Sequence, residues 1–420
     1  MVQGRSGRKR AGENRYAAFW ERVTREDRAA ASSCGGAVPA RSGAAGPAYS
    51  SASASAQPNA VVPAQPDAGA PVRPNASAPA QSNAAAPTPA FDAAFPSVRR
   101  AMDRGLIAVR AYGADELAAL LPMPDARAHK YSRGKLTLIG GAAAYPGAVC
   151  LAAAASQRMG AGYTEVCCAE ESVAVVRAFR PSLVVRAWDG LEADDFASAR
   201  VGRPVAYAVG SGMDASSKQG AEEAKRLVHA ALKHAHAPVL VDGGGLSALA
   251  SGKGRRLLRR RFVNGWPTVI TPHAGEAARL AAPLGLPTDD PGRLACLLAL
   301  AYGVVAVVKG PDTFISDGDE VVRVAEGTPA LAKAGTGDVL AGMLGALLAQ
   351  GRAPLDAAAL AVTLHARAGR LAAQRLTDIG VAAEDVVEFL PAAIVDVAEA
   401  PSRSDAAAQQ PGLLRRLSRR

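Results

Sequence analysis

Between about residues 112 and 398, short apolar runs alternate with longer stretches in which apolar residues recur at helical spacing. The short runs predict buried strands, and the longer stretches predict helices. Strands that alternate with helices favour an α/β fold with a mostly parallel central sheet and helices on both faces. The predicted strands are 136–140, 164–168, 205–209, 239–241, 268–270 and 304–308, with a hairpin from 313–316 and 321–324. The predicted helices are 147–159, 171–179, 217–234, 291–302, 338–350, 355–376 and 384–397, with one more from about 275.

The most informative stretch is Ala-Gly-Thr-Gly-Asp at residues 334–338, which the apolar spacing places at the start of a helix, at or near Asp338. Gly335 and Gly337 allow a tight turn, so amide N–H groups can point at one spot at the positive end of the helix dipole. A carboxylate in the first helical turn can take a proton from a hydroxyl. An anion cradle beside such a base suits phosphoryl transfer to an alcohol. These residues alone are equally consistent with a glycine-rich helix start that Asp338 caps.

Composition divides the chain, because residues from about 28 to 95 are mostly Ala, Pro, Ser, Gly and Asn, with almost no large apolar side chains. Such a segment cannot bury enough apolar surface to offset the entropy of ordering it. We therefore predict a disordered Ala/Pro/Ser-rich segment at 1–111, one α/β domain at 112–398 and a basic disordered tail at 399–420. The predicted domain is long enough to bury a full hydrophobic core.

The net charge of +10 comes largely from arginines near both ends of the chain. Such ends could contact nucleic acid or an anionic surface, but solvated arginine-rich tails are the more common case, and we expect no nucleic-acid partner. The five cysteines form no C-x-x-C pattern and no ligand spacing with histidine, which favours reduced thiols in a cytoplasmic protein. We expect no membrane association, because no signal-peptide pattern and no apolar run of spanning length occurs.

Several polar and glycine-rich motifs follow the predicted strands in a fixed order. They are His-Lys-Tyr-Ser-Arg-Gly-Lys from residue 129, Ala-Val-Gly-Ser-Gly at 208–212, Thr-Pro-His-Ala-Gly-Glu at 271–276, Val-Lys-Gly-Pro-Asp-Thr at 308–313, Ala-Gly-Thr-Gly-Asp at 334–338, Leu-His at 364–365 and Ala-Glu-Asp at 383–385. From about residue 115 to 397, this set resembles the ADP- or ATP-dependent NAD(P)H-hydrate dehydratases, a branch of the ribokinase-like fold. Each motif alone is a weak signal, whereas their order and spacing together are specific.

The resemblance implies repair of damaged nicotinamide cofactors. In that family a nucleotide phosphorylates the C6 hydroxyl of the S epimer of hydrated NADH or NADPH (NADHX or NADPHX), and loss of phosphate restores the cofactor. This chemistry agrees with the residues, because phosphate leaves far more readily than hydroxide. The resemblance also implies Mg²⁺ on the nucleotide, ADP or ATP as donor with ADP favoured by family analogy, and a homo-oligomer that is commonly a tetramer. Residues 1–111 hold too few apolar residues for an epimerase domain, so we expect any NAD(P)HX epimerase to be a separate protein.

The resemblance further implies roles for single residues. Asp338 would take the proton from the C6 hydroxyl, beside an anion hole of Gly335, Thr336 and Gly337. The nucleotide-binding residues would be Lys309, Gly310, Pro311, Asp312, Thr313 and Gly337, and the substrate-binding residues would be Ala148, Gly210, Gly212, His273 and Asp338. Glu276 would support the site or a bound metal, His365 would be structural, and no metal ligand is assigned. Plain alternatives stay open: Lys309 as a strand-end lysine, His273 as a polar loop residue and Ala148 as a helix-packing residue.

The chain departs from the family pattern in several places. After the central strand, Asp-Ala-Asp-(Ala/Gly)-Leu is replaced by Asp-Gly-Gly-Gly-Leu at 242–246, which lacks the second acidic residue. The Gly-Pro-Gly-Leu-Gly loop reads Gly-Ser-Gly-Met-Asp at 210–214, and the Asn of the Thr-Gly-Asn stretch is absent from Glu-Gly-Thr-Pro-Ala at 326–330. If the lost groups handle metal or nucleotide, these changes would alter substrate choice or lower the rate. Lys309, His273 and Asp338 are retained.

Two other functions remain open on the sequence. A ribokinase-like kinase of a small vitamin-type alcohol would share the Gly-Thr-Gly-Asp turn, but it would accumulate a phosphate ester instead of releasing phosphate. A non-catalytic relative, whose basic ends bind a partner, is the other alternative, and the departures from the family pattern are the main argument for it.

Overall fold

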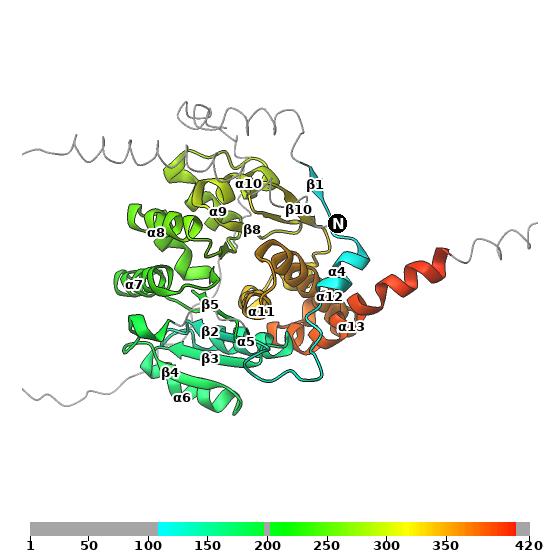
Figure 1. Cartoon of the computed structure of the whole chain (residues 1–420), viewed down its shortest axis with the longest axis horizontal. Coiled ribbons are helices and arrows are strands. Elements are labelled where there is room, and N and C mark those ends of the chain that lie inside the picture. The colour runs from blue at the N-terminus through cyan, green and yellow to red at the C-terminus, as the bar shows by residue number, and fades with distance from the viewer. Residues whose placement is uncertain (1–107, 197–201, 409–420) are drawn as a thin grey trace, which may run out of the picture. The chain divides into compact units, whose positions relative to one another are not determined.

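The computed structural model describes residues 108–196 and 202–408. Their strands form one ten-stranded sheet in the order β1-β10-β9-β8-β7-β6-β5-β2-β3-β4 (Figure 1). Neighbouring strands are parallel, except that β9 is antiparallel to both β8 and β10. The strands are β1 (Val109–Arg110), β2 (Lys135–Ile139), β3 (Tyr163–Cys168), β4 (Val184–Ala187), β5 (Val205–Val209), β6 (Val239–Val241), β7 (Thr268–Ile270), β8 (Val305–Val308), β9 (Thr313–Ser316) and β10 (Val321–Val324).

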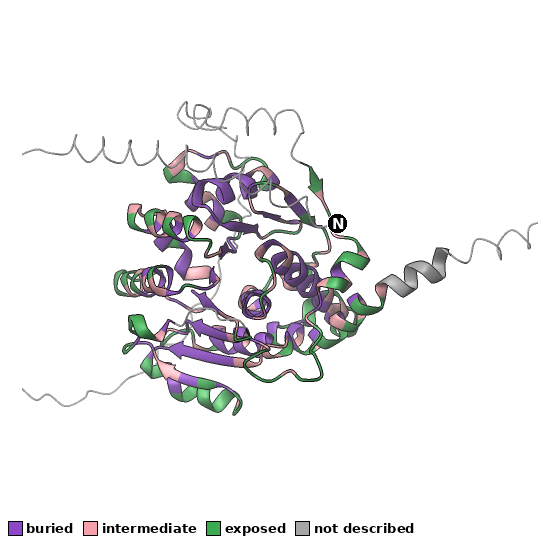
Figure 2. Cartoon of the chain, in the orientation of Figure 1, coloured by how far each residue is buried: buried purple, intermediate pink, exposed green. Residues whose placement is uncertain are grey.

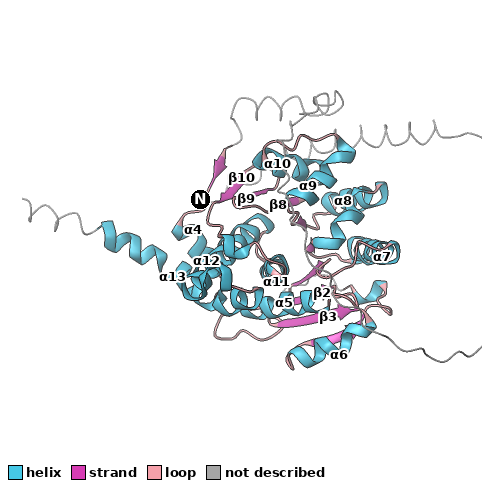
Figure 3. Ribbon diagram, turned by 180° about the vertical axis from the view of Figure 1, so that it is seen from behind, coloured by secondary structure: helices cyan, strands magenta, loops and turns pink. Residues whose placement is uncertain are grey.

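Helices cover both faces of this sheet (Figures 1 and 3), which confirms the predicted α/β architecture. One face carries α5 (Pro146–Arg158), α11 (Thr336–Ala349), α12 (Pro354–Gly380) and α13 (Ala383–Ala408), and the opposite face carries α7 (Lys218–His234), α8 (Gly252–Val263), α9 (Ala274–Ala281) and α10 (Pro291–Tyr302). Two further helices complete the layers: α6 (Glu170–Phe179) packs on α5 and β4, and α4 (Ala114–Leu120) packs on α13.

Helix α11 lies deep in its helix layer, since every residue from 339 to 349 is buried (Figure 2). A helix that is apolar on every side is stable only where protein surrounds it. Gly342 makes this position possible, because a Cβ there would lie 2.0 Å from the carbonyl oxygen of Ala152 in α5. The close approach of α5 and α11 fixes the N-terminus of α11 near the carboxyl ends of the parallel strands.

Helix α8 was not predicted, because its many charged residues obscure the apolar periodicity of its buried face. Its sequence is Gly-Lys-Gly-Arg-Arg-Leu-Leu-Arg-Arg-Arg-Phe-Val, and its buried residues include Leu258 and Arg261. The Arg261 guanidinium donates hydrogen bonds to the carbonyl oxygens of Ala235 and Ala237, both at 2.5 Å. Burial lowers the pKa of Arg261 to about 9. A fully hydrogen-bonded arginine can thus take a core position that apolar periodicity assigns to an aliphatic residue.

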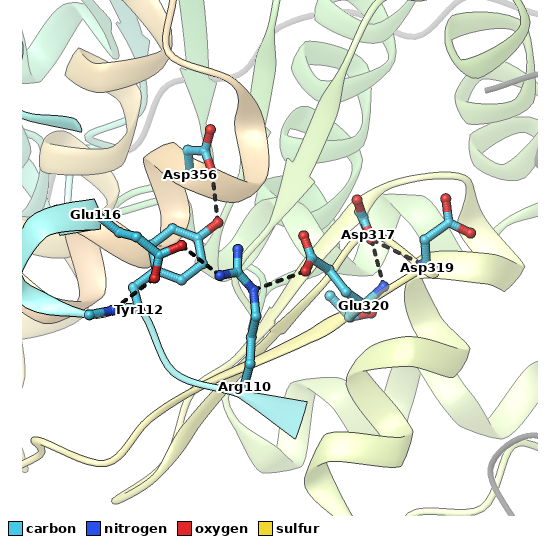
Figure 4. A network of polar contacts seen from close by, with 9 residues as sticks. Arg110, Tyr112, Glu116, Asp317, Asp319, Glu320 and Asp356 are labelled. Carbon is cyan, nitrogen blue, oxygen red and sulfur yellow. Dashed lines mark hydrogen bonds and ion pairs between the residues drawn. The ribbon is translucent and has the colours of Figure 1, made fainter. Parts of the chain in front are cut away.

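The outer edge of the sheet is fastened by the polar network in Figure 4. Arg110 on β1 contacts Glu320, just ahead of β10, at 3.0 Å, and Glu116 on α4 at 2.8 Å. The Tyr112 hydroxyl donates a 2.6 Å hydrogen bond to Asp356 at the start of α12. Burial and this carboxylate raise the pKa of Tyr112 well above its usual value. These contacts tie the first described strand and helix to both β10 and α12.

The described residues do not reach far into the segments predicted to be disordered. Residues 1–107 and 409–420 lie outside them, so the predictions for these ends stay predictions. Strand β1 lies just ahead of the predicted start of the domain, and α13 continues past its predicted end at residue 398. Within the described ranges, no helix combines the length and the apolar character that crossing a membrane requires.

Gly342→Ala should destabilise the fold by about 1–3 kcal/mol, because its Cβ would meet the α5 backbone, which cannot rotate away. The measurement is the free energy of unfolding in denaturant. Gly190→Ala is the matched control, since nothing lies within 4 Å of a Cβ built there, and its effect should be small. Equal stability losses in the two variants would contradict this account of helix packing.

Candidate active site

The N-terminus of α11 lies beside the carboxyl ends of the central strands, namely β2, β5, β6, β7 and β8. We call this end of the strands the carboxyl edge of the sheet. Strand order reverses between β2 and β5, and ligands of open α/β sheets bind in the crevice at such a switch point. The structure brings the predicted site residues to this edge. They are Ala148 in the first turn of α5, Gly210 and Gly212 after β5, His273 after β7, residues 309–313 after β8, and residues 335–338 at the start of α11.

The loop after β5 packs closely against its neighbours and requires its glycines. Gly210 has a φ of 128°, and a Cβ there would lie 1.8 Å from the carbonyl oxygen of Asp242. Gly212 has a φ of 66°, and its Cβ would lie 2.6 Å from the carbonyl oxygen of Tyr145 and 2.8 Å from Ala148 Cβ. The predicted substrate contacts Gly212 and Ala148 are therefore adjacent.

The N-terminus of α11 has the geometry of an anion site. Gly335 is its N-cap residue with a φ of 90°, and a Cβ there would lie 2.7 Å from Leu151 Cδ1. The Thr336 hydroxyl turns inward, 2.8 Å from the Leu331 carbonyl oxygen and 2.9 Å from that of Lys333. The first amide N–H groups of a helix have no carbonyl partner within it, so they can bind an anion at the positive end of the dipole.

Lys309 lies among three carboxylates at this edge. Its ammonium is 2.9 Å from Asp242 Oδ1, and the Thr271 hydroxyl donates a 2.6 Å hydrogen bond to the same oxygen. Burial opposes the charge of Lys309, but the carboxylates of Asp242, Glu276 and Asp338 outweigh it and raise its pKa. The ammonium is only 3.6 Å from where a Cβ of residue 337 would lie, so it stands beside the anion site of α11.

Asp338 occupies the first turn of α11, as predicted, and its carboxyl group is electrostatically perturbed. Burial, together with the negative charge of Asp242, raises the pKa of Asp338 to about 6. A hydrogen bond with the Ser211 side chain and the charge of Lys309 act in the opposite direction. A carboxylate whose pKa lies close to neutral is well matched to accepting a proton from a hydroxyl.

His273 is the N-cap residue of α9 and forms a capping box with Glu276. Its Nδ1 accepts a 3.1 Å hydrogen bond from the Gly275 amide, and its own amide donates a 2.8 Å hydrogen bond to Glu276 Oε2. The amide of Lys309 donates to the carbonyl oxygen of Pro272, so His273 and Lys309 are held side by side. The His273 side chain is 56% exposed, which leaves its ring accessible to a ligand.

Two other predicted groups lie in different surroundings, one in a turn with local contacts and one inside a helix. In residues 309–313, the Thr313 hydroxyl donates to the Gly310 carbonyl oxygen at 3.2 Å, and Asp312 pairs with Arg323 on β10. His365 is buried in α12, and this burial lowers its pKa to about 4, so the ring is neutral near pH 7. The structural role predicted for His365 stays a prediction.

Sequence reasoning did not assign Asp242, Thr271 or Ser211 to the site, although each follows a predicted strand closely. Their position at carboxyl strand ends was a usable signal. The 242–246 loop leaves no room for a side chain at residue 244 unless it shifts, because a Cβ on Gly244 would lie 2.4 Å from the carbonyl oxygen of Met213.

No group of three or more His, Cys, Asp or Glu side chains is arranged to hold a metal ion in the described part of the chain. Mg²⁺ is commonly bound through one or two carboxylates together with the phosphates of a nucleotide. Asp242 and Asp338 could supply such carboxylates, so these residues fit a Mg²⁺ ion that arrives with a nucleotide.

Comparison with known proteins yields related sequences over most of the described residues. The model of a family described as NAD(P)H-hydrate dehydratase matches residues 136–392. The chain is 29% identical over 292 residues to an ADP-dependent (S)-NAD(P)H-hydrate dehydratase of Cenarchaeum symbiosum, covering 68% of this chain and 96% of that protein. It is 31% identical over 281 residues to a protein of the same name from Xanthomonas campestris, covering 64% and 91%.

Solved structures and a longer relative extend this comparison. The ADP/ATP-dependent NAD(P)H-hydrate dehydratase of Bacillus subtilis, co-crystallized with ATP and Mg²⁺, has a TM-score of 0.57 at 26% identity, covering 69% of this chain and 99% of that one. A ribokinase-like superfamily protein of Enterococcus faecalis, 24% identical, has a TM-score of 0.57, covering 69% and 97%, which confirms the predicted fold. The chain also matches 52% of the length of a bifunctional NAD(P)H-hydrate repair enzyme of Escherichia coli, 30% identical over 285 residues and 67% of this chain.

Proposed function

The chain belongs to the NAD(P)H-hydrate dehydratase family, and on this premise we propose that it restores NADH and NADPH from the S epimers of their hydrates. It is a hydro-lyase that uses an adenine nucleotide to turn the C6 hydroxyl into a better leaving group. The observation that carries the proposal is the position of Asp338, a carboxylate with a raised pKa, at the N-terminus of α11 and close to Lys309.

Asp338 is proposed to start the reaction as a general base. Its carboxylate accepts the proton of the C6 hydroxyl as the hydroxyl oxygen attacks the terminal phosphorus of the nucleotide. The bond from that phosphorus to the bridging oxygen breaks, and the nucleotide leaves one phosphate shorter. The N–H groups at residues 335–337 receive the charge on the phosphoryl oxygens, and Lys309 adds a positive charge beside them. The phosphate then leaves C6 with the electron pair of the C–O bond. The neighbouring carbon loses a proton to water, and the electron pair of its C–H bond forms the ring double bond again, which restores the reduced cofactor.

The proposed nucleotide donor is ADP, since the relatives from Cenarchaeum symbiosum and Xanthomonas campestris are both named ADP-dependent. Mg²⁺ bound with the nucleotide would neutralise charge on its phosphates. The predicted tetramer, the separate epimerase partner and the cytoplasmic location stay predictions.

The substrate-side assignments rest on the loops at the switch point. Ala148, Gly210 and Gly212 are proposed to contact the hydrated nicotinamide, because the start of α5 and the loop after β5 pack together at the switch point. His273 is proposed to contact the substrate through its exposed ring, held by Glu276. Residues 309–313 are proposed to bind the nucleotide on the other side of Asp338.

The proposed function predicts a rise in the near-ultraviolet absorbance of reduced nicotinamide when the protein is mixed with (S)-NADHX, Mg²⁺ and ADP. Inorganic phosphate should appear in equal amount, because dehydration releases it. The same assay with ATP identifies the preferred donor. Nucleotide consumption that produces a stable phosphate ester, with neither NADH nor free phosphate, would instead indicate a kinase.

The electrostatics of Asp338 predict a pH profile. The value of kcat/KM for NADHX should fall as pH drops through about 6, because protonated Asp338 cannot accept the hydroxyl proton. Asp242→Asn should move this fall to lower pH, since the charge of Asp242 helps to raise the pKa of Asp338. Ser211→Ala should move it to higher pH, since its hydrogen bond lowers that pKa. Shifts in the same direction for both variants would rule out this assignment of the base.

A further inference from the structure

Thr377 has a strained backbone at the kink of α12. Its φ of 68° and ψ of 157° lie in a region that essentially only glycine adopts, and it is the one non-glycine residue with positive φ in the described ranges. Such a conformation persists only where surrounding contacts over-determine it. The kink stands directly before the turn into α13, so the strain belongs to the junction of the two helices, which we define as residues 377–382.

Two side chains from the segment ahead of α11 hold this junction. The Thr328 hydroxyl donates a 3.1 Å hydrogen bond to Asp378 Oδ1. The Lys333 ammonium donates a 2.6 Å hydrogen bond to the carbonyl oxygen of Ile379 and another to that of Val381. Together these contacts form a clamp between residues 328–333 and the junction. Hydrogen bonds from a charged donor are the stronger ones, so Lys333 is the main part of the clamp.

The clamp is continuous with the anion site of α11. The carbonyl oxygen of Lys333 is 2.9 Å from the hydroxyl of Thr336. On the other side, a Cβ on Gly335 would lie 3.0 Å from the Cβ of Ala383, the first residue of α13. Any shift of the junction would therefore reach the backbone at residues 335–337 from two directions.

We propose that Lys333 is a positioning residue, which holds the N–H groups at residues 335–337 in place for the transferred phosphoryl group by clamping the strained junction. The role of those N–H groups rests on the proposed function. The contacts of the clamp keep the backbone of Thr377 in its strained conformation. Without the Lys333 ammonium, Thr377 relaxes into an allowed conformation, the junction shifts, and the anion site loses its alignment.

The substitution Thr377→Gly should remove the need for Lys333. Glycine adopts the clamped conformation without strain, so a junction with this substitution no longer needs Lys333 to keep its place. Alanine retains the Cβ and the strain. Both substitutions remove the 3.3 Å hydrogen bond that the Gly380 amide donates to Thr377 Oγ1, which makes Thr377→Ala the matched control.

The experiment compares Lys333→Met, Lys333→Arg, and Lys333→Met combined with Thr377→Gly or with Thr377→Ala. In Lys333→Met, kcat should fall about tenfold to a hundredfold with a smaller change in the KM for nucleotide, since misalignment acts on the chemical step. Amide hydrogen exchange at residues 329–337 and 377–383 should become faster. Thr377→Gly should reverse both effects in the Lys333→Met background, Thr377→Ala should reverse neither, and Lys333→Arg should stay near wild type.

Wild-type kcat and exchange in Lys333→Met would overturn the proposal, as would equal behaviour of the two double variants. Hydrogen exchange needs no substrate, so it tests whether Lys333 holds the junction even if the protein does not act on NADHX. Absence of NADHX turnover in the wild type would contradict the proposed function alone.

Discussion

The close contact between α5 and α11 is the constraint on which the site depends. Helix α11 is apolar all round and must be enclosed, and the backbone of α5 can pass it only because Gly342 has no side chain. This packing sets the position of α11 relative to the sheet. The start of the helix, with its amide groups and Asp338, therefore lies opposite the ends of β5, β6 and β8.

The same enclosure sets the charges of the site. Burial at the end of α11 disfavours an ionised Asp338, and the nearby carboxylate of Asp242 disfavours it further. Lys309, which pairs with Asp242, is close enough to moderate this effect without abolishing it. Asp338 thus becomes a proton acceptor suited to neutral pH because it shares the charge of Lys309 with Asp242. The Lys309 ammonium also lies where it can pair with a phosphate group.

The elements that depend on residues close together in the sequence could be predicted from it. The buried strands are brief apolar runs. The Gly-Thr-Gly-Asp sequence predicted the start of α11 to within one helical turn. Features that depend on distant partners were not accessible. Arg261 takes a core position through carbonyl groups far along the chain, and the pairing of Asp242 with Lys309 joins residues 67 positions apart. The helix predicted to end at residue 376 does stop being regular there, at the kink of Thr377, but sequence periodicity cannot link Lys333 to this junction.

The most direct test of the account is the turnover of (S)-NADHX by Asp338→Asn, measured together with nucleotide affinity. Asparagine keeps the shape of the side chain but cannot accept the hydroxyl proton. The account predicts a loss of turnover of about a hundredfold or more with nucleotide binding retained, as expected for removal of a general base. Turnover close to that of the wild type would contradict the central claim that Asp338 accepts the proton.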